Sequence, residues 1–124
     1  MTDNAESLPK LPLPLSHFRR VQNTIYISGQ ASVDENGAIV PGTFEEEFRR
    51  TMEVVKRVLA AAGSRLGNVV QVRSYVRDAA NLKLYNALYA EYFQEPYPAR
   101  TTITGCLSDV IHFEMDCIAV ADEA

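Results

Sequence analysis

The sequence predicts an α+β fold in which a mixed β-sheet carries two helices packed on one face. Residues 43–62 and 81–93 repeat apolar side chains at helical spacing, whereas residues 69–76 and 111–120 alternate apolar and polar side chains as strands do. The predicted order is strand, strand, helix, strand, helix, strand, strand. With 124 residues, the chain has room for one such domain and not for two ordinary ones.

The N-terminal part is predicted to be an extended leader over residues 1–14, followed by a single domain over residues 15–124. Prolines at positions 9, 12 and 14 exclude a helix in the leader and favour an extended path. From Phe18 onward no linker, low-complexity run or repeat interrupts the chain.

A hairpin and a turn are predicted at the start of the domain. Residues 24–28 are rich in residues that favour strands, and residues 19–22 can pair with them around Asn23. Residues 34–37 end in Asn-Gly, the dipeptide that type I′ turns prefer, and are therefore predicted to be a turn.

The first helix is predicted to begin at Thr43 and to end before Gly63. Thr43 and Glu46 have the spacing of a capping box, and Gly63 suits the left-handed residue that often follows a helix. One apolar stripe runs along this segment and consists of Phe48, Met52, Val55, Leu59 and Ala62.

The second helix is predicted over residues 81–93, with Asn81 as its N-cap. Strands over residues 69–76, 100–104 and 111–120 complete the sheet. On the first of these three strands, one face is predicted to carry Val70, Val72 and Val76.

With both helices on one face, the other face of the sheet is predicted to be bare of helices. The last strand directs Ile118 and Val120 toward this bare face. Exposed apolar faces are commonly covered by a partner, so we expect a second copy of the chain to cover it.

The composition excludes several classes of function. The formal net charge of −4 offers no basic surface for phosphates, so no nucleic-acid partner is expected. No apolar run approaches the ~20 residues that cross a bilayer, and the N-terminus lacks the apolar core of a secretory signal. Two cysteines without C-x-x-C spacing indicate reduced thiols, so a cytoplasmic protein without a membrane partner is expected.

Metal and thiol chemistry find little support in the sequence. His112, Glu114 and Asp116 share one face of the predicted strand, but only His17 remains as another imidazole ligand. A polar strand face is the simpler interpretation, and no metal is expected. Cys117 falls on the apolar side of its strand and is predicted to be a core residue.

Arg100 and Glu114 are the more promising candidates for chemistry. Arg100 follows Pro-Ala at the start of a strand, where its guanidinium can hold a carboxylate through two parallel hydrogen bonds. Glu114 belongs to the next strand, and antiparallel pairing of the two strands would bring it near Arg100. Two interpretations stay open: a catalytic pair, and a salt bridge without a catalytic role.

Five short motifs follow one another in a recognisable order and spacing. They are Ile27-Ser28-Gly29-Gln30, Ala60-Ala61-Ala62-Gly63, Tyr75-Val76-Arg77-Asp78, Pro98-Ala99-Arg100-Thr101-Thr102 and Glu114-Met115-Asp116-Cys117-Ile118-Ala119-Val120. Each motif is weak alone. Together they make the chain resemble the RidA/YjgF family of reactive intermediate deaminases, from Pro14 to Val120.

The resemblance implies a chorismate-mutase-like fold and a homotrimer with its sites at subunit interfaces. It also implies hydrolysis of 2-enamine or 2-imine acids to 2-keto acids and ammonia, with no metal or organic cofactor. By this resemblance Arg100 binds the substrate and Glu114 is the catalytic glutamate. Four further positions match residues that border the family's pocket: Ser28, Gly29, Asn86 and Thr102.

The chain departs from the family pattern at two positions. Leu15 stands where archetypal members carry a tyrosine, and Thr102 where many carry a cysteine whose backbone amide faces the ligand. Because Leu15 changes the pocket wall, a 2-aminomuconate-type deaminase is one alternative. A second is a non-catalytic, regulatory trimer that binds 2-keto acids through Arg100. A third is a ribonuclease, against which the acidic charge weighs.

Overall fold

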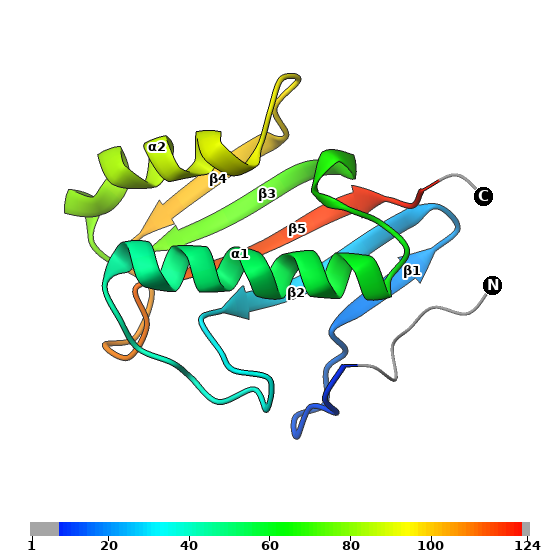
Figure 1. Cartoon of the computed structure of the whole chain (residues 1–124), viewed down its shortest axis with the longest axis horizontal. Helices are drawn as coiled ribbons and strands as arrows, with labels where there is room; N and C mark the ends of the chain where they lie inside the picture. The colour runs from blue at the N-terminus through cyan, green and yellow to red at the C-terminus, as the bar shows by residue number, and fades with distance from the viewer. Residues whose placement is uncertain (1–7, 123–124) are drawn as a thin grey trace.

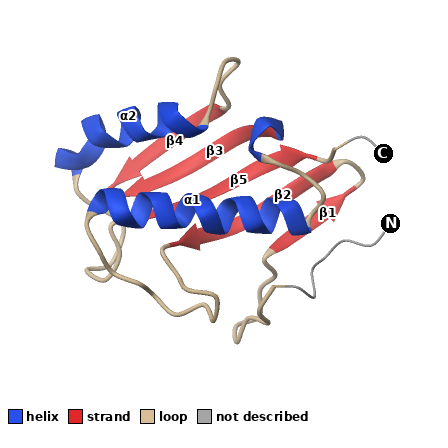
Figure 2. Cartoon of the chain, in the orientation of Figure 1, coloured by secondary structure: helices blue, strands red, loops and turns tan. Residues whose placement is uncertain are grey.

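The computed structural model describes residues 8–122, so residues 1–7 of the predicted leader lie outside it. The described chain has two layers, a five-stranded sheet and two helices that lie across one face of it (Figure 1). The strands are β1 (Phe18–Val21), β2 (Thr24–Ala31), β3 (Val69–Val76), β4 (Ala99–Thr104) and β5 (Phe113–Val120). The helices are α1 (Phe44–Ala61) and α2 (Leu82–Tyr92). The predicted α+β fold with both helices on one face is confirmed (Figure 2).

The strand order β1-β2-β5-β3-β4 makes the sheet mixed. β3 and β4 run parallel and are joined by α2, whereas all other neighbouring strands pair antiparallel. β3 therefore lies between β4 and β5. The predicted pairing of the Arg100 strand with the last strand is wrong, because the helical crossover returns the chain beside β3 at the sheet edge.

The predicted hairpin and turn are confirmed. β1 and β2 pair with Val21 opposite Thr24, and Gln22 in the turn between them has φ +54°. Such left-handed backbone values match the turn to the twist of the two strands. In the second turn the amide of Gly37, at φ +84°, donates a 2.9 Å hydrogen bond to the carbonyl of Asp34.

Helix α1 begins and ends where the sequence predicts. The Thr43 hydroxyl accepts a 3.1 Å hydrogen bond from the Glu46 amide, and the Glu46 carboxylate accepts a 2.8 Å bond from the Thr43 amide. Gly63 has φ +86°, the left-handed value that suits glycine after a helix. Within residues 8–122, no helix is long and apolar enough to cross a membrane.

Two local predictions are wrong for backbone reasons. Asn81 does not cap α2 with its side chain, because its φ of −92° and ψ of 2° continue the 3-10 turn that precedes the helix. Val70 does not share the buried face of β3 but is 49% exposed. The pairing of β3 with β5 shifts register between Val69 and Gln71, which reverses the alternation at that end of the strand.

Aromatic rings fill the core between the two layers. The ring of Phe48 on α1 lies 4.8 Å from that of Phe113 on β5 and 6.1 Å from that of Tyr85 on α2. All three side chains are fully buried. This cluster therefore joins both helices to the sheet.

A buried carboxylate connects the start of α1 to the start of β5. Glu47 is 1% exposed and accepts hydrogen bonds from the backbone amides of Gly42 (3.1 Å) and His112 (2.8 Å). The Nδ1 atom of His112 lies 2.8 Å from the same carboxylate. The His112 ring therefore faces α1 and does not share a face with Glu114, contrary to the prediction, because β5 begins only at Phe113.

We expect Glu47→Gln to lower the free energy of unfolding by about 1–3 kcal/mol, because an amide nitrogen accepts no hydrogen bond and leaves a buried donor unpaired. Urea denaturation at one protein concentration measures the loss. Glu53→Gln is the matched control, since Glu53 lies on the same helix with a side chain 65% exposed and pairs with Lys56. It should cost less than about 0.5 kcal/mol. Equal losses in the two variants would contradict a stabilising role for the Glu47 contacts.

Candidate active site

The predicted site residues fall into two groups at different places in the fold. The β2–β5 group consists of Leu15, Ser28, Gly29 and Glu114. The β4–α2 group consists of Asn86, Arg100 and Thr102. Each group is coherent by itself, and the sheet separates them.

Glu114 lies on the face of the sheet that the helices leave open. Its neighbours Phe113 and Met115 are fully buried beneath the helices, so strand alternation directs Glu114 to the opposite side. Gly29 of β2 lies directly beside it, since a Cβ added to Gly29 would overlap the Glu114 carboxylate and lie 3.2 Å from its Cδ. Glycine at this position therefore leaves room for the carboxylate.

The segment before β1 packs along the edge of β2. The Ser28 amide donates to the His17 carbonyl (3.0 Å), and the Ser28 hydroxyl donates to the Ser16 carbonyl (2.5 Å). Leu15, Ser28 and Gly29 line one hollow of about 270 Å³ beside α1. Leu15, Ser28 and Gly29 thus lie together, and Gly29 also adjoins Glu114, which does not line the hollow.

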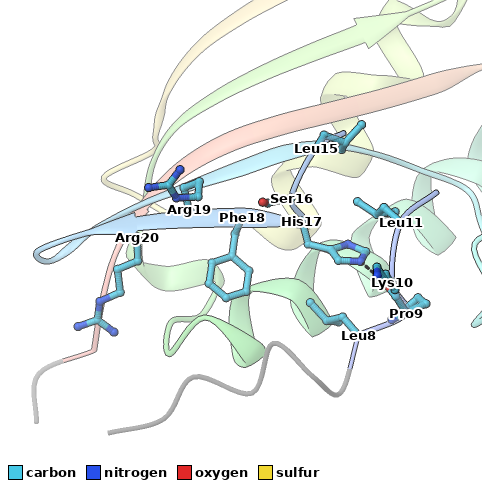
Figure 3. A pocket seen from close by; sticks show the side chains of 10 residues that line it. All are labelled: Leu8, Pro9, Lys10, Leu11, Leu15, Ser16, His17, Phe18, Arg19 and Arg20. Carbon is cyan, nitrogen blue, oxygen red and sulfur yellow. Dashed lines mark hydrogen bonds between the residues drawn. The ribbon is translucent and has the colours of Figure 1, made fainter. Parts of the chain in front are cut away.

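A larger groove of about 780 Å³ lies against the same segment (Figure 3). Figure 3 shows the His17 ring pointing toward Pro9, whose carbonyl is 2.5 Å from His17 Nε2. Leu15 lines this groove, but Arg100 and Glu114 do not. Although this groove is the larger of the two, it lacks both residues and is therefore not the site that the sequence predicts.

Arg100 lies near the start of β4, on the face that the helices cover. It stands opposite Val72 of β3, which is fully buried, and residues paired in a ladder point to the same side. Its Cζ atom lies 5.0 Å from the ring centre of Tyr85 and 4.8 Å from that of Tyr89, both on α2. No ion pair or hydrogen bond of the guanidinium is found within residues 8–122, so its donors are available to an anion.

Thr102 and Asn86 complete the β4–α2 group. Thr102 stands opposite Ser74 of β3, which is fully buried, so its side chain points to the same face as Arg100. The Thr102 hydroxyl is buried and has no hydrogen-bond partner in the described part of the chain. Asn86 is exposed on α2. Thr102 thus adds an unsatisfied polar group on the side of β4 that Arg100 occupies.

The two groups do not meet within one chain. Glu114 stands opposite Tyr75 of β3, and Tyr75 stands opposite Ile103 of β4, three residues beyond Arg100. The backbone positions of Glu114 and Arg100 therefore lie about 10 Å apart along the strands and about 10 Å apart across them, and their side chains point to opposite faces. The predicted approach of Glu114 to Arg100 is wrong within one chain, both as a catalytic pair and as a salt bridge, because β3 separates their strands.

The surroundings of Glu114 favour its protonated form. Burial, together with the negative charge of Asp116 on the same face, raises the pKa of Glu114 above its ordinary value. Asp116 accepts hydrogen bonds from Arg73 Nε (2.8 Å) and from the Tyr75 hydroxyl (2.7 Å). Glu114 is therefore shifted toward the range in which a carboxyl exchanges protons efficiently near neutral pH.

Both sequence and fold match a known family. The family model described as Endoribonuclease L-PSP covers residues 7–121. The chain belongs to the YjgF/RidA family. The resemblance predicted from the five motifs is thereby confirmed.

Relatives within the YjgF/RidA family match most of the chain. A RutC family protein of Pyrococcus abyssi is 37% identical over 116 residues, which cover 92% of this chain and 91% of that protein. A 2-iminobutanoate/2-iminopropanoate deaminase of Dermatophagoides farinae is 31% identical over 101 residues, covering 78% of this chain and 79% of its own. The crystal structure of RidA from an Antarctic Psychrobacter species superposes with a TM-score of 0.83 at 28% identity, over 97% of this chain and 98% of that one.

Sequence reasoning missed three residues that shape this YjgF/RidA site. Tyr85 and Tyr89 of the second helix have no role predicted from the sequence, yet their rings contact the guanidinium. Their spacing of one helical turn, shortly before an arginine on the following strand, is the signal that could have found them. The influence of Asp116 on Glu114 follows from strand alternation, which places residues i and i+2 on one face.

Within residues 8–122 the cysteines and acidic residues form no further reactive cluster. Cys117 is 3% exposed, and burial, with a smaller contribution from Asp116, raises its pKa to about 12, so the thiol stays protonated in the core as predicted. Cys106 is an exposed free thiol. In the described part of the chain, no group of three or more His, Cys, Asp or Glu side chains could hold a metal ion.

We expect Asp116→Asn to lower the pKa of Glu114, because removing a neighbouring negative charge favours the ionised carboxylate. NMR titration of the side-chain carboxyl carbons measures this pKa. Asp122→Asn is the matched control, since Asp122 pairs with Arg65 beyond the end of β5 and should leave Glu114 unchanged. An unchanged or raised Glu114 pKa in Asp116→Asn would refute the electrostatic cause.

The same shift has a signature in folding stability. Because the pKa of Glu114 is higher in the folded than in the unfolded chain, the folded state binds this proton more tightly. The contribution of Glu114 to stability is therefore lost as pH rises from the unfolded value through the folded one. Glu114→Gln should remove this part of the pH dependence.

Proposed function

We propose that the protein hydrolyses reactive 2-imino and 2-enamino carboxylic acids to 2-keto acids and ammonia. The observation that carries this proposal is the guanidinium of Arg100. It has no ion-pair or hydrogen-bond partner in the described chain, contacts the rings of Tyr85 and Tyr89, and lies where a carboxylate can reach it. Glu114, whose pKa is raised, supplies a proton acceptor. A relative at 31% identity bears the name of a 2-iminobutanoate/2-iminopropanoate deaminase, which supports the same reaction.

In this proposal Arg100 binds the substrate carboxylate. A guanidinium presents pairs of N–H donors that match two carboxylate oxygens, and the opposite charges strengthen these bonds. Thr102 adds the unsatisfied hydroxyl and the outward backbone groups of an edge strand, and Asn86 adds an exposed amide on α2. With the carboxylate held, the imine carbon takes a defined position.

Glu114 acts on the attacking water. It accepts a proton from water as the water oxygen bonds to the imine carbon, and the electron pair of the C=N bond moves to nitrogen. The proton then passes to the nitrogen, which gives a tetrahedral amino alcohol. As this adduct collapses, the proton of its hydroxyl also moves to the nitrogen, so that the C–N bond breaks, ammonia leaves and the C–O bond becomes the keto group. An enamine substrate first takes a proton at carbon 3 to become the imine. Water supplies every atom that this reaction consumes.

We further propose that each site forms between subunits of a homotrimer. Arg100 and Glu114 lie on opposite faces of one chain, so a small substrate contacts both only if a second copy supplies one of them. The face that the helices leave open also exposes apolar side chains for a neighbour to cover. These are Tyr26, Ile103 and Val120, which are 48%, 37% and 41% exposed.

Leu15 would influence the substrate range. It lines the hollow of about 270 Å³ with Ser28 and Gly29, and Gly29 adjoins Glu114. An aliphatic wall favours imino acids with apolar side chains over 2-aminomuconate, which carries a second carboxylate.

We propose the cytoplasm as the place of action. Both cysteines are free thiols, which fits a reducing compartment. Two fungal relatives carry the word mitochondrial in their names, so cell fractionation is the direct test.

We expect Arg100→Ala to lower kcat/KM for imine hydrolysis by at least ~100-fold, because each charge-assisted hydrogen bond contributes about 1.5–3 kcal/mol. In the assay an amino-acid oxidase generates the imino acid, which either reacts with semicarbazide or is hydrolysed by the protein. The decrease in semicarbazone reports the rate of hydrolysis. Arg65→Ala is the matched control, since Arg65 is exposed and pairs with Asp122. Full acceleration by Arg100→Ala would rule out this substrate-binding role.

Glu114→Gln separates chemistry from binding. The variant should bind 2-ketobutyrate as the wild type does and lose about 10²–10⁴-fold in rate. Equal loss of binding and rate would make Glu114 a structural residue. A wild-type protein that binds 2-ketobutyrate without accelerating hydrolysis would support the non-catalytic, regulatory alternative.

We expect a mixture of the inactive Arg100→Ala and Glu114→Gln proteins to recover about a quarter of the wild-type activity after subunit exchange. If each interface takes Arg100 from one subunit and Glu114 from the next, random mixing restores both groups at about one interface in four. Light scattering after gel filtration tests whether the mixed assembly is a trimer. No recovery in an exchanged trimer would mean that the site does not combine these two residues across an interface.

A further inference from the structure

The Arg100 side chain is exposed, but aromatic rings hold its guanidinium. Its Cζ atom lies 5.0 Å from the ring centre of Tyr85 and 4.8 Å from that of Tyr89, within the range over which a cation and a ring attract. We call these two rings the aromatic seat. Both belong to α2, whereas Arg100 belongs to β4.

The aromatic seat is itself rigid. Tyr85 is fully buried, and its hydroxyl donates a 2.6 Å hydrogen bond to the hydroxyl of Ser74 on β3, which is also fully buried. The Tyr85 ring packs edge-on against Phe48 at 6.1 Å, and the Tyr89 ring stacks on Phe93 at 4.5 Å. Neither ring can turn away without breaking contacts in the core.

A guanidinium held in this way suits carboxylate binding. Its five N–H donors lie in one plane, and contact with an aromatic ring does not consume them. A free arginine side chain samples many rotamers, and an anion that binds it must first restrict them. Contact with the aromatic seat restricts them in advance.

We propose that Tyr85, held by its hydrogen bond to Ser74, is a positioning residue that orients the Arg100 guanidinium for an incoming carboxylate. The inference rests on the proposed function, in which Arg100 binds the substrate. Tyr85 acts through Arg100 and needs no contact with the substrate. With Tyr85 in place, KM for 2-imino acids should be lower than in a variant without this ring, whereas kcat, which reports the chemical step, should change little.

The test replaces the ring and compares two sites on one helix. Tyr85→Leu should raise KM by about 5- to 30-fold and change kcat by less than about twofold. Tyr92→Leu is the matched control, because the Tyr92 ring contacts Lys56 and Arg49 at 5.4 and 5.9 Å. It should leave KM unchanged. An unchanged KM in folded Tyr85→Leu would overturn the proposal.

A double-mutant cycle distinguishes positioning from a general structural effect. In an Arg100→Gln background, which has no cation to orient, Tyr85→Leu should change kcat/KM by less than about twofold. An undiminished effect in that background would overturn the proposal. If Tyr85→Leu does not fold, Tyr89→Leu removes the other ring and is judged by the same two measurements.

An NMR readout on the free protein does not depend on the reaction. In the wild type the Arg100 side-chain protons should show ring-current shifts and restricted motion, and Tyr85→Leu or Tyr89→Leu should diminish both. A mobile, unshifted Arg100 in the wild type would overturn the proposal. An oriented Arg100 in a wild-type protein that hydrolyses no imine would leave the positioning intact and defeat the proposed function alone.

Discussion

The alternation of side chains along β5 is the constraint on which both the core and the site depend. β5 pairs with β2 on one side and β3 on the other, so a shift of one residue would exchange its two faces along its whole length. In the observed register Phe113 and Met115 are fully buried beneath the helices, and Glu114 lies on the open face. The packing that stabilises the fold therefore also decides where this carboxyl lies. Neither can be changed without changing the other.

The position of β3 adds a second constraint, because it keeps two opposite charges apart. An ion pair between Arg100 and Glu114 within the chain would satisfy both groups and leave neither for a ligand. β3 instead separates their strands, while its own Arg73 pairs with Asp116 at 2.8 Å. Since the net charge of the chain is −4, attraction of the anionic substrate in the proposed function depends on the local field of Arg100. The strand order therefore prevents Glu114 from neutralising the charge of Arg100 within the chain.

Elements determined by neighbouring residues could be predicted from the sequence. The capping box at Thr43 and the turn at Gln22 need only contacts within a few residues. The exposure of Val70 and the distance from Arg100 to Glu114 could not be predicted, because they depend on a register shift and a strand order that involve the whole chain. Family resemblance named Gly29, but only the pairing of β2 with β5 shows why glycine is needed beside the carboxylate.

The aromatic core extends the influence of the fold into the site. Phe48 contacts Tyr85, and Tyr85 contacts Arg100. The packing between α1 and α2 therefore influences the position of the guanidinium. A chain of this size buries few side chains, so few are available to orient a long arginine at a shallow surface site. Here buried rings that already stabilise the fold can serve that purpose as well. If Arg100 binds the substrate as proposed, substitutions deep in the core, such as at Ser74, therefore affect substrate binding through Arg100 without any contact with the substrate.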